Sequence, residues 1–429
     1  MTFTVALSGD SLLMRGSIIG TDARARRLQQ LMRTADVTFT NLEVVASDLR
    51  TYQASGAGTP TLVAPPLVLD ELVALGIDVV SFANNHALNL GIEGMLDTIR
   101  GLRERRISCA GVGMDLSEAS MPVYVDKPTG SVSVVACTTT FTSGDEATRP
   151  SQSMIGRPGL NPVRYASRAA VTKEQLAELV KIHDALGLTA RIEHWREMGF
   201  IPPAGRDDYI LFGTTFFADG EPRIETNCNA TDLDRIRLWI SEAKARSDIA
   251  IFSVHSHEGS ESTTEIPAFL IELSHTAIDA GADAVVGHGP HRIRGVEIYR
   301  GKPIFYSLGN FISQAELMGR LSSHTYDVLS ADPELPPYQV IGGSSGGFAR
   351  NAEYWRSFVP ILRYQDGTLF GIEIHPIEQG FGGPEIRRGR PSLARGEIAA
   401  VVVDELTRLS ERFGTTVRND GVRTWIELA

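Results

Sequence analysis

Apolar runs of strand length alternate with amphipathic segments of helix length over residues 1–140, and the alternation resumes at residue 232. The apolar runs predict strands at 3–8, 37–40, 79–83, 107–111, 132–137, 249–255 and 283–288. The amphipathic segments predict helices at 24–33, 66–75, 90–105, 232–246 and 266–280. Strand–helix–strand repeats are typical of a parallel or mixed sheet covered by helices, so the pattern predicts an α/β fold.

The block at residues 142–230 interrupts this alternation. The sequence Thr-Lys-Glu-Gln at 172–175 has the spacing of a capping box, which predicts a helix at 173–186. Residues 209–227 are predicted to form a hairpin around Ala-Asp-Gly-Glu at 218–221. We interpret the block as an inserted α+β subdomain on the substrate side of a single domain that spans 1–429.

Residues 313–354 form a long stretch without clear hydrophobic periodicity. A loop of this length in a compact domain is usually functional or disordered. Our hypothesis is a lid over the site, and the alternative is a mobile surface excursion. Hairpins are predicted at 296–308 and around 365–367, and a helix at 397–412.

Polar side chains of the kinds that bind metals follow the predicted strands. They are Asp10, Glu43, Asn85, His86, His255, His257, His288 and His291. Because ligands bind at the carboxyl ends of strands in α/β sheets, we expect these side chains to meet. A single histidine or Asn-Asn-His at a strand end is as easily explained by a structural hydrogen bond or a turn. Five such strand ends in one chain favour a metal site.

The ligand types indicate which metals and which chemistry to expect. Carboxylate, amide oxygen and imidazole suit Mn, Zn or Fe, and a carboxylate that bridges two ions would give a dinuclear centre. We therefore predict one or two divalent transition ions as cofactor, with a metal-activated hydroxide as the attacking group. The chain has no Gly-x-Ser-x-Gly nucleophile motif, no phosphate-binding Gly-x-x-x-x-Gly-Lys-Ser/Thr loop and no dinucleotide-binding glycine motif.

Charge and composition exclude several classes of partner and site. The formal net charge of −11 argues against a nucleic acid or an anionic membrane as partner. The chain has no apolar stretch long enough for a membrane span and no signal-peptide pattern at its start, which predicts a cytoplasmic protein. Cys109, Cys137 and Cys228 are too widely spaced for a thiolate zinc site. A homo-oligomer is compatible with the sequence.

The strand-end motifs also resemble a known family. Gly9-Asp10, Asn41-Leu42-Glu43, the Ala-Asn-Asn-His at 83–86, Ser-Val-His at 253–255, Gly-His-Gly-Pro-His at 287–291 and Tyr-Ser-Leu-Gly-Asn-Phe at 306–311 are similar to those of the bacterial capsule synthesis (CapA, PgsA-like) proteins associated with poly-γ-glutamate. That family is related to the calcineurin-like metallophosphoesterases. The resemblance implies a sandwich of two mixed β-sheets flanked by helices, with a dinuclear metal site.

The resemblance also implies roles for single residues. It assigns metal binding to Asp10, Glu43, Asn85, His255, His288 and His291, with His86 as general acid. Asn84 and His257 are expected to contact the substrate, and His257 is also a candidate additional ligand. The chain departs from the family pattern at Glu43, which stands where the bridging Asp is usual, and at Asn89, which stands where the family has Asp.

The resulting functional prediction is a metal-dependent hydrolase acting on an amide in a small-molecule or short peptide-like substrate of the glutamyl type. Arg157 and Arg164 lie in a loop restrained by Pro and Gly, and their guanidinium groups suit a substrate carboxylate. The alternative for both arginines is that they are solvated surface charges. The alternatives for the protein are a calcineurin-like phosphoesterase and a non-catalytic factor in poly-γ-glutamate or capsule synthesis.

Overall fold

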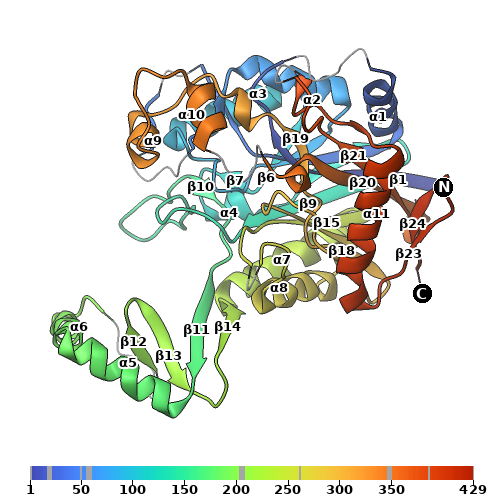
Figure 1. Ribbon diagram of the computed structural model, residues 1–429. Helices are drawn as coiled ribbons and strands as arrows, with labels where there is room; N and C mark the ends of the chain where they lie inside the picture. The colour runs from blue at the N-terminus through green and yellow to red at the C-terminus, as the bar shows by residue number, and fades with distance from the viewer. Residues whose placement is uncertain are drawn as a thin grey trace.

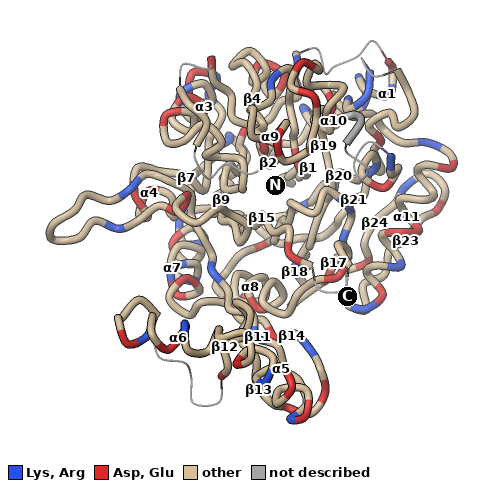
Figure 2. Tube along the Cα trace, turned by 60° about the vertical axis from the view of Figure 1, so that its left-hand side comes forward, with Lys and Arg blue, Asp and Glu red and all other residues tan. Residues whose placement is uncertain are grey.

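Two mixed β-sheets pack face to face, with helices on the outer face of each (Figure 1). The computed structural model describes residues 2–16, 22–48, 51–54, 60–201, 208–259, 262–344, 350–384 and 387–428. This arrangement confirms the predicted α/β sandwich. Figure 2 shows acidic and basic residues interspersed around the outside of the molecule. In the part of the chain that the structure describes, no helix is both long enough and apolar enough to cross a membrane.

The larger sheet contains the strand that begins the chain. Its spatial order is β23 (Val417–Asn419), β24 (Thr424–Ile426), β21 (Thr368–Glu378), β20 (Arg356–Gln365), β1 (Thr2–Leu12), β2 (Val37–Leu42), β5 (Val79–Ser81) and β6 (Ser108–Ala110). Strands β19 (Asn310–Ser313) and β22 (Ser392–Leu393) pair with β1 and β21. Because β1, β2, β5 and β6 are parallel, their carboxyl ends lie at one edge of the sheet.

The smaller sheet presents its parallel strands to the same region. Its spatial order is β17 (Val296–Tyr299), β18 (Lys302–Phe305), β16 (Ala284–His288), β15 (Ile249–His255), β9 (Gly130–Thr138) and β8 (Val123–Lys127). Strands β9, β15, β16 and β18 are parallel to one another. Two short pairs complete the body: β3 (Val45–Ala46) with β4 (Val63–Ala64), and β7 (Val112–Gly113) with β10 (Gly159–Leu160).

Alternation along the strands creates the layers, because successive side chains of a strand face opposite sides of its sheet. On β1, Leu7 packs between the sheets and Ala6 packs toward the outer helices. On β15, Ile251 packs between the sheets and Phe252 packs outward. The outer helices are α1 (Ala23–Thr34), α2 (Leu69–Leu75) and α3 (Gly91–Glu104) on the larger sheet, and α7 (Ala230–Arg246) and α8 (Ala268–Asp279) on the smaller one.

The predicted helices and core strands are confirmed to within a few residues. The second predicted helix begins as the 3-10 helix η1 (Pro66–Val68) and ends at Gly76, whose φ of 82° is the left-handed conformation that glycine favours. The C-terminal helix is α11 (Gly396–Ser410), which continues as η5 (Glu411–Phe413) and packs Val402 and Leu406 into the core between the sheets. A short helix, α4 (Leu116–Ser120), was not predicted.

The inserted block contains a small sheet of its own. Its order is β12 (Tyr209–Leu211), β13 (Thr214–Ala218), β11 (Tyr165–Val171) and β14 (Arg223–Cys228), accompanied by α5 (Lys173–Ala185) and α6 (Leu188–Glu197). The predicted capping box is present at the start of α5. Figure 1 shows this sheet and its helices projecting from the body beyond α7 and α8.

The hairpin predicted around 218–221 is wrong, because β11 lies between β13 and β14 and pairs with both. The tight hairpin instead joins β12 and β13 through Phe212 and Gly213, whose φ values are 53° and 80°. Positive φ at both turn residues is what a two-residue hairpin requires. The pairing of β11 is non-local, so the local turn signal at 218–221 was misleading.

The segment at 313–354 is more structured than the predicted loop. It contains η2 (Ala315–Leu317), α9 (Ser323–Val328), α10 (Pro337–Ser344) and η3 (Ala352–Trp355). The side chain of Ser322 caps α9 by accepting a hydrogen bond from the amide of Thr325. These helices are too short to show a clear hydrophobic period, which explains why the sequence pattern missed them.

Candidate metal centre

Asp10 is turned into the space between the sheets by a bulge in β1. Leu7 pairs with Phe39 of β2, whereas Asp10 pairs with Asn41, so β1 contains one residue more than β2 over this interval. The extra residue gives Asp10 the same facing as Leu7. The amide of Asp10 donates to the carbonyl of Gly309 at 3.0 Å.

Gly9 permits this close approach of β1 to the chain before β19. A Cβ at Gly9 would lie 1.8 Å from the carbonyl oxygen of Gly309. That separation is far shorter than any non-bonded contact, so another residue at position 9 would force the two strands apart. The glycine before Asp10 is therefore explained by packing.

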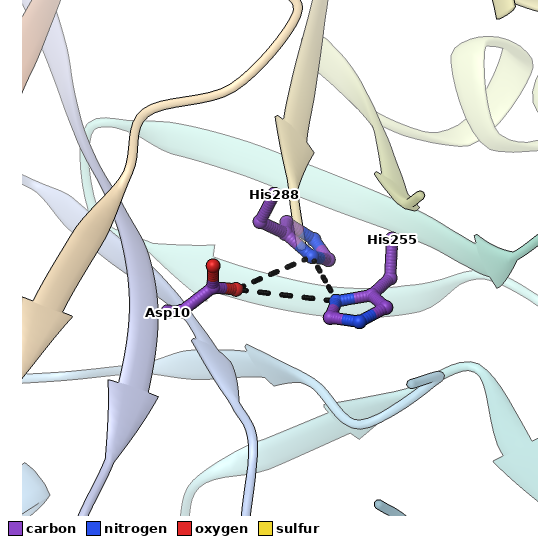
Figure 3. A group of neighbouring side chains, drawn as sticks. All are labelled: Asp10, His255 and His288. Atoms are coloured by element: carbon purple, nitrogen blue, oxygen red, sulfur yellow. Dashed lines mark hydrogen bonds and ion pairs between the residues drawn. The ribbon is translucent and has the colours of Figure 1, made fainter. Parts of the chain in front are cut away.

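The carboxylate of Asp10 lies beside three histidines from the other half of the site. Its Oδ1 is 3.8 Å from Nδ1 of His288 and 3.9 Å from Nδ1 of His255 (Figure 3). Its Oδ2 is 3.4 Å from Nδ1 of His291 and accepts a hydrogen bond from the amide of Gly289 at 3.0 Å. The Nδ1 atoms of His255 and His288 are 3.0 Å apart.

Glu43 lies at the centre of a second group of imidazoles. Its Oε1 is 3.8 Å from Nε2 of His86, His255 and His257, and 3.6 Å from Nε2 of His291. Its side chain is fully buried. Neither carboxylate oxygen has a hydrogen-bond partner among the residues that the structure describes. Burial, with Asp10 nearby, raises the pKa of Glu43 well above its usual range, and His291 opposes that shift.

These separations fit ligands of a shared ion. Two atoms that each lie about 2.1 Å from one ion are separated by about 3.0 Å at a right angle and about 4.2 Å when opposite. The carboxylate–imidazole distances of 3.4–3.9 Å fall in that range. The groups that place their ligand atoms together are Asp10 with His255 and His288; Glu43 with His255 and His257; and Asp10 with Glu43 and His291. The residues present therefore fit one or two divalent ions.

The imidazoles of His255 and His288 are held in the neutral form by their surroundings. Burial lowers the pKa of His288 to about 4 and that of His255 well below its usual range. His288 Nε2 is 2.7 Å from the hydroxyl of Ser253, and His255 Nε2 is 2.9 Å from Oδ1 of Asn85. A neutral imidazole with one nitrogen fixed by a hydrogen bond presents the other to a metal.

His86 faces the same centre from the loop after β5. Its Nδ1 is 2.8 Å from Oδ1 of Asn89, and its amide donates to Oδ1 of Asn84 at 3.1 Å. Burial lowers the pKa of His86 to about 3, so the imidazole is neutral at pH 7. With Nδ1–H donating to Asn89, Nε2 presents a lone pair toward Glu43.

Of the two candidate substrate residues near the cluster, His257 lines a cavity and Asn84 is buried behind the loop. His257 lies at the cluster and lines an adjoining cavity of about 510 Å³, together with Asn85, His86 and His291. Asn84 is fully buried and donates from Nδ2 to the carbonyl of Leu42, so it supports the loop that carries His86.

Neither candidate arginine is brought to the cluster. Arg164 uses its guanidinium on Asp232, with Nε and one terminal nitrogen each 2.8 Å from a carboxylate oxygen. Arg157 lies near Asp145, whose pKa burial raises to about 6 against the opposing charge of Arg157. Neither arginine lines the cavity beside the cluster. Among the described residues of the inserted block, Thr142 lines this cavity.

Two asparagines of the site were not assigned roles from the sequence. Asn41 donates from Nδ2 to Oδ1 of Asp10 at 2.8 Å, and Oδ1 of Asn310 lies 2.8 Å from Nδ1 of His291. Both residues stand at strand ends, in motifs that carried the family resemblance. This strand-end placement was the sequence signal that could have marked both asparagines as site residues.

A family model for the bacterial capsule synthesis protein PGA_cap matches residues 4–315. The chain belongs to this family. The resemblance seen in the strand-end motifs is thereby confirmed.

Proteins similar to this one differ in how much of the chain they match. Protein y4uA of Sinorhizobium fredii is 35% identical over 434 residues, covering 97% of this chain and 91% of the relative. The PGA biosynthesis protein CapA of Bacillus subtilis is 25% identical over 293 residues, covering 68% of this chain and 57% of the relative. A solved structure described as a novel phosphatase from Mycoplasma pneumoniae is similar with a TM-score of 0.40 and 10% identity, covering 88% of this chain and 94% of that one.

Proposed function

We propose that the protein is a metal-dependent hydrolase that cleaves an amide or a related carboxylic acid derivative. The observation that carries this proposal is Glu43, a fully buried carboxylate that lacks a hydrogen-bond partner in the described chain and faces four imidazoles. Burying a charge without compensation costs several kcal/mol. A divalent ion of Mn, Zn or Fe between Glu43, Asp10 and the histidines would remove that cost.

The chain supplies binding and proton transfer. When bound, the divalent ion supplies Lewis-acid activation of water and of the scissile group. His86 presents Nε2 to the same space, with its tautomer set by Asn89. We propose that Nε2 of His86 accepts the proton that the attacking water releases and passes it to the leaving group, which makes His86 the general acid of the second step.

The identity of the substrate is less constrained by the site. The positions of Arg157 and Arg164 do not support recognition of a glutamyl carboxylate by these residues, because Arg164 is paired with Asp232. A phosphoester remains an alternative to an amide, since the same activated water serves both reactions.

A non-catalytic role is the second candidate. The Bacillus subtilis relative is named a PGA biosynthesis protein, which favours a metal-retaining factor in polymer synthesis. The cluster opens onto a cavity lined by Asn85, His86, His257 and His291, which favours a site that turns over a small molecule.

One experiment separates these proposals. Purified protein is analysed for metal and then screened, with added Mn or Zn, against parallel panels of amides and phosphoesters. Glu43→Gln is expected to lose metal and turnover together. His275→Gln is the matched control, because His275 on α8 pairs with Glu297 of β17 rather than with a residue of the cluster. Turnover of amides supports the proposal. Stoichiometric metal without turnover of either panel would contradict it and favour the synthesis factor.

A further inference from the structure

The cavity beside the metal centre has two unlike walls. One wall is the cluster itself, through Asn85, His86, His257 and His291. Another part of the lining comes from the segment that carries η2, α9 and α10, through Met318, Leu329 and Ile341 among others. Figure 1 shows α9 and α10 on the side of the molecule where α3 lies, away from the projecting sheet of β11–β14.

The lining away from the cluster is mainly apolar. Leu12, Leu62, Met318 and Ile341 contribute side chains that are almost completely buried, and Phe141 adds an aromatic ring. A cavity of about 510 Å³ is within the range of sites for small molecules. The apolar part of this lining gains affinity by removing apolar surface from water and gives no hydrogen bonds to a charged group. The same lining also has polar members, Thr140, Thr142 and Thr325.

The charged residues of the lining also disfavour an anionic group in the cavity. No Lys or Arg lines the cavity in the described chain, and its acidic lining residue is Glu316. A terminal nitrogen of Arg388 lies 3.0 Å from Oε2 of Glu316, so the charge of Glu316 is matched within the protein. A substrate carboxylate or phosphate placed against this lining would meet no Lys or Arg among the lining residues that the structure describes, so no cation there would compensate its desolvation.

We infer that the substrate carries an uncharged, mainly apolar group, such as an unbranched acyl or an aryl group, that occupies the space between the cluster and the α9–α10 segment. This inference deepens the proposed function and rests on it for the position of the scissile bond, which must lie at the cluster. It separates this site from one built for a polyanionic chain or a nucleotide. Specificity is then set by Met318, Leu329 and Ile341.

The test measures binding apart from turnover. Zinc-loaded protein is titrated by calorimetry with acetyl, butyryl and hexanoyl hydroxamates, whose head groups bind metals. The hexanoyl compound is compared with a hydroxamate of equal chain length that ends in a carboxylate. Affinity should rise about fourfold for each added methylene. The terminal carboxylate should weaken binding by about tenfold or more.

A charge substitution in the lining sharpens the test. Leu329 lines the cavity and is 36% exposed, so Leu329→Lys places a cation there without burying it. It should shift preference toward the carboxylate-ended hydroxamate. Leu238→Lys is the matched control, because Leu238 is 65% exposed on α7 and does not line the cavity. Its preference should equal that of the unaltered protein.

The outcomes distinguish this inference from the proposed function. Affinity that rises with alkyl length, in a protein that cleaves no amide or phosphoester, supports the apolar group and contradicts the hydrolase. Preference of the unaltered protein for the carboxylate-ended compound, equal affinity for both, or no binding of either would overturn this inference, whatever the turnover assay gives.

Discussion

Oε1 of Glu43 and Nε2 of His291 lie 3.6 Å apart, although Glu43 follows a strand of the larger sheet and His291 follows a strand of the smaller one. His291 has a φ of 59°, a left-handed conformation that is unusual for a residue with a side chain. Such strain is kept where the surrounding structure determines the position, often at functional sites. The pair joins the two sheets at the point where the chemistry is expected.

Removing the charge of Glu43 is predicted to stabilise the metal-free protein. The pKa of Glu43 is raised in the folded state, so the folded protein holds this proton more tightly than the unfolded chain does. Its contribution to stability is therefore present below pH 4.5 and is lost as pH rises toward the raised pKa. Metal-free Glu43→Gln should keep its melting temperature at pH 8 better than metal-free unaltered protein does.

At each pH, the difference between the two proteins measures the effect of the Glu43 charge, including its interaction with His291. Thermal unfolding from pH 4 to pH 8, with and without added zinc, measures it. With zinc the order should reverse, since the ion compensates the carboxylate. Equal pH dependence of the two metal-free proteins would contradict the account of Glu43 as an uncompensated buried charge.

His86→Ala is predicted to lower kcat while leaving the metal content nearly unchanged. The loss should be on the order of 10²–10⁴-fold, which is typical for a general acid or base. It should be smaller for substrates with good leaving groups, because these need less protonation. Steady-state kinetics across a leaving-group series, with metal analysis of each preparation, measures both effects.

The control for this prediction is His275→Ala, which removes an imidazole that pairs with Glu297 away from the cluster. Its kcat and metal content should match those of the unaltered protein. Equal losses across all leaving groups, or a parallel loss of metal, would make His86 a ligand rather than a proton carrier.

Gly9→Ala is predicted to destabilise the protein and to weaken metal binding together. The added Cβ would lie 1.8 Å from the carbonyl oxygen of Gly309, so β1 must move and carry Asp10 with it. Overpacking of this kind costs on the order of 3 kcal/mol. Gly319→Ala is the control, because a Cβ there meets no atom within 4 Å. Denaturant unfolding and metal analysis should separate the two variants, and similar stability of both would refute the role given to Gly9.

Most strands and helices of the two-sheet body could be predicted from the sequence, because the patterns that indicate them lie within short stretches of the chain. Strand β15 was predicted with its observed bounds, since Ile249–His255 is a continuous apolar run that ends in a polar side chain. The helix after β5 and the capping box of α5 likewise depend on residues close in sequence. The proximity of His255 and His288 followed from the rule that parallel strands of one sheet share a carboxyl edge. Asp10 ends a strand of the other sheet, so its approach to these histidines depends on how the two sheets pack.

The errors involve partners that lie far apart in the sequence. The pairing of β11 with β13 and β14 could not be predicted from the turn at 218–221. Arg164 pairs with Asp232, a residue at the start of α7, and no local pattern marks that partner. The helices α9 and α10 are too short for a periodic signal, although residues of this segment line the cavity.

Metal analysis of the purified protein beside Asp10→Ala, Asn85→Ala and His288→Ala tests the central claim most directly. Asp10 and His288 contribute to one candidate ligand group, and Asn85 contacts His255. We predict one or two divalent transition ions per chain in the unaltered protein and a reduced content in each variant, because a ligand lost from a small set is not replaced by its neighbours. Full occupancy in all three variants would contradict the metal centre described here.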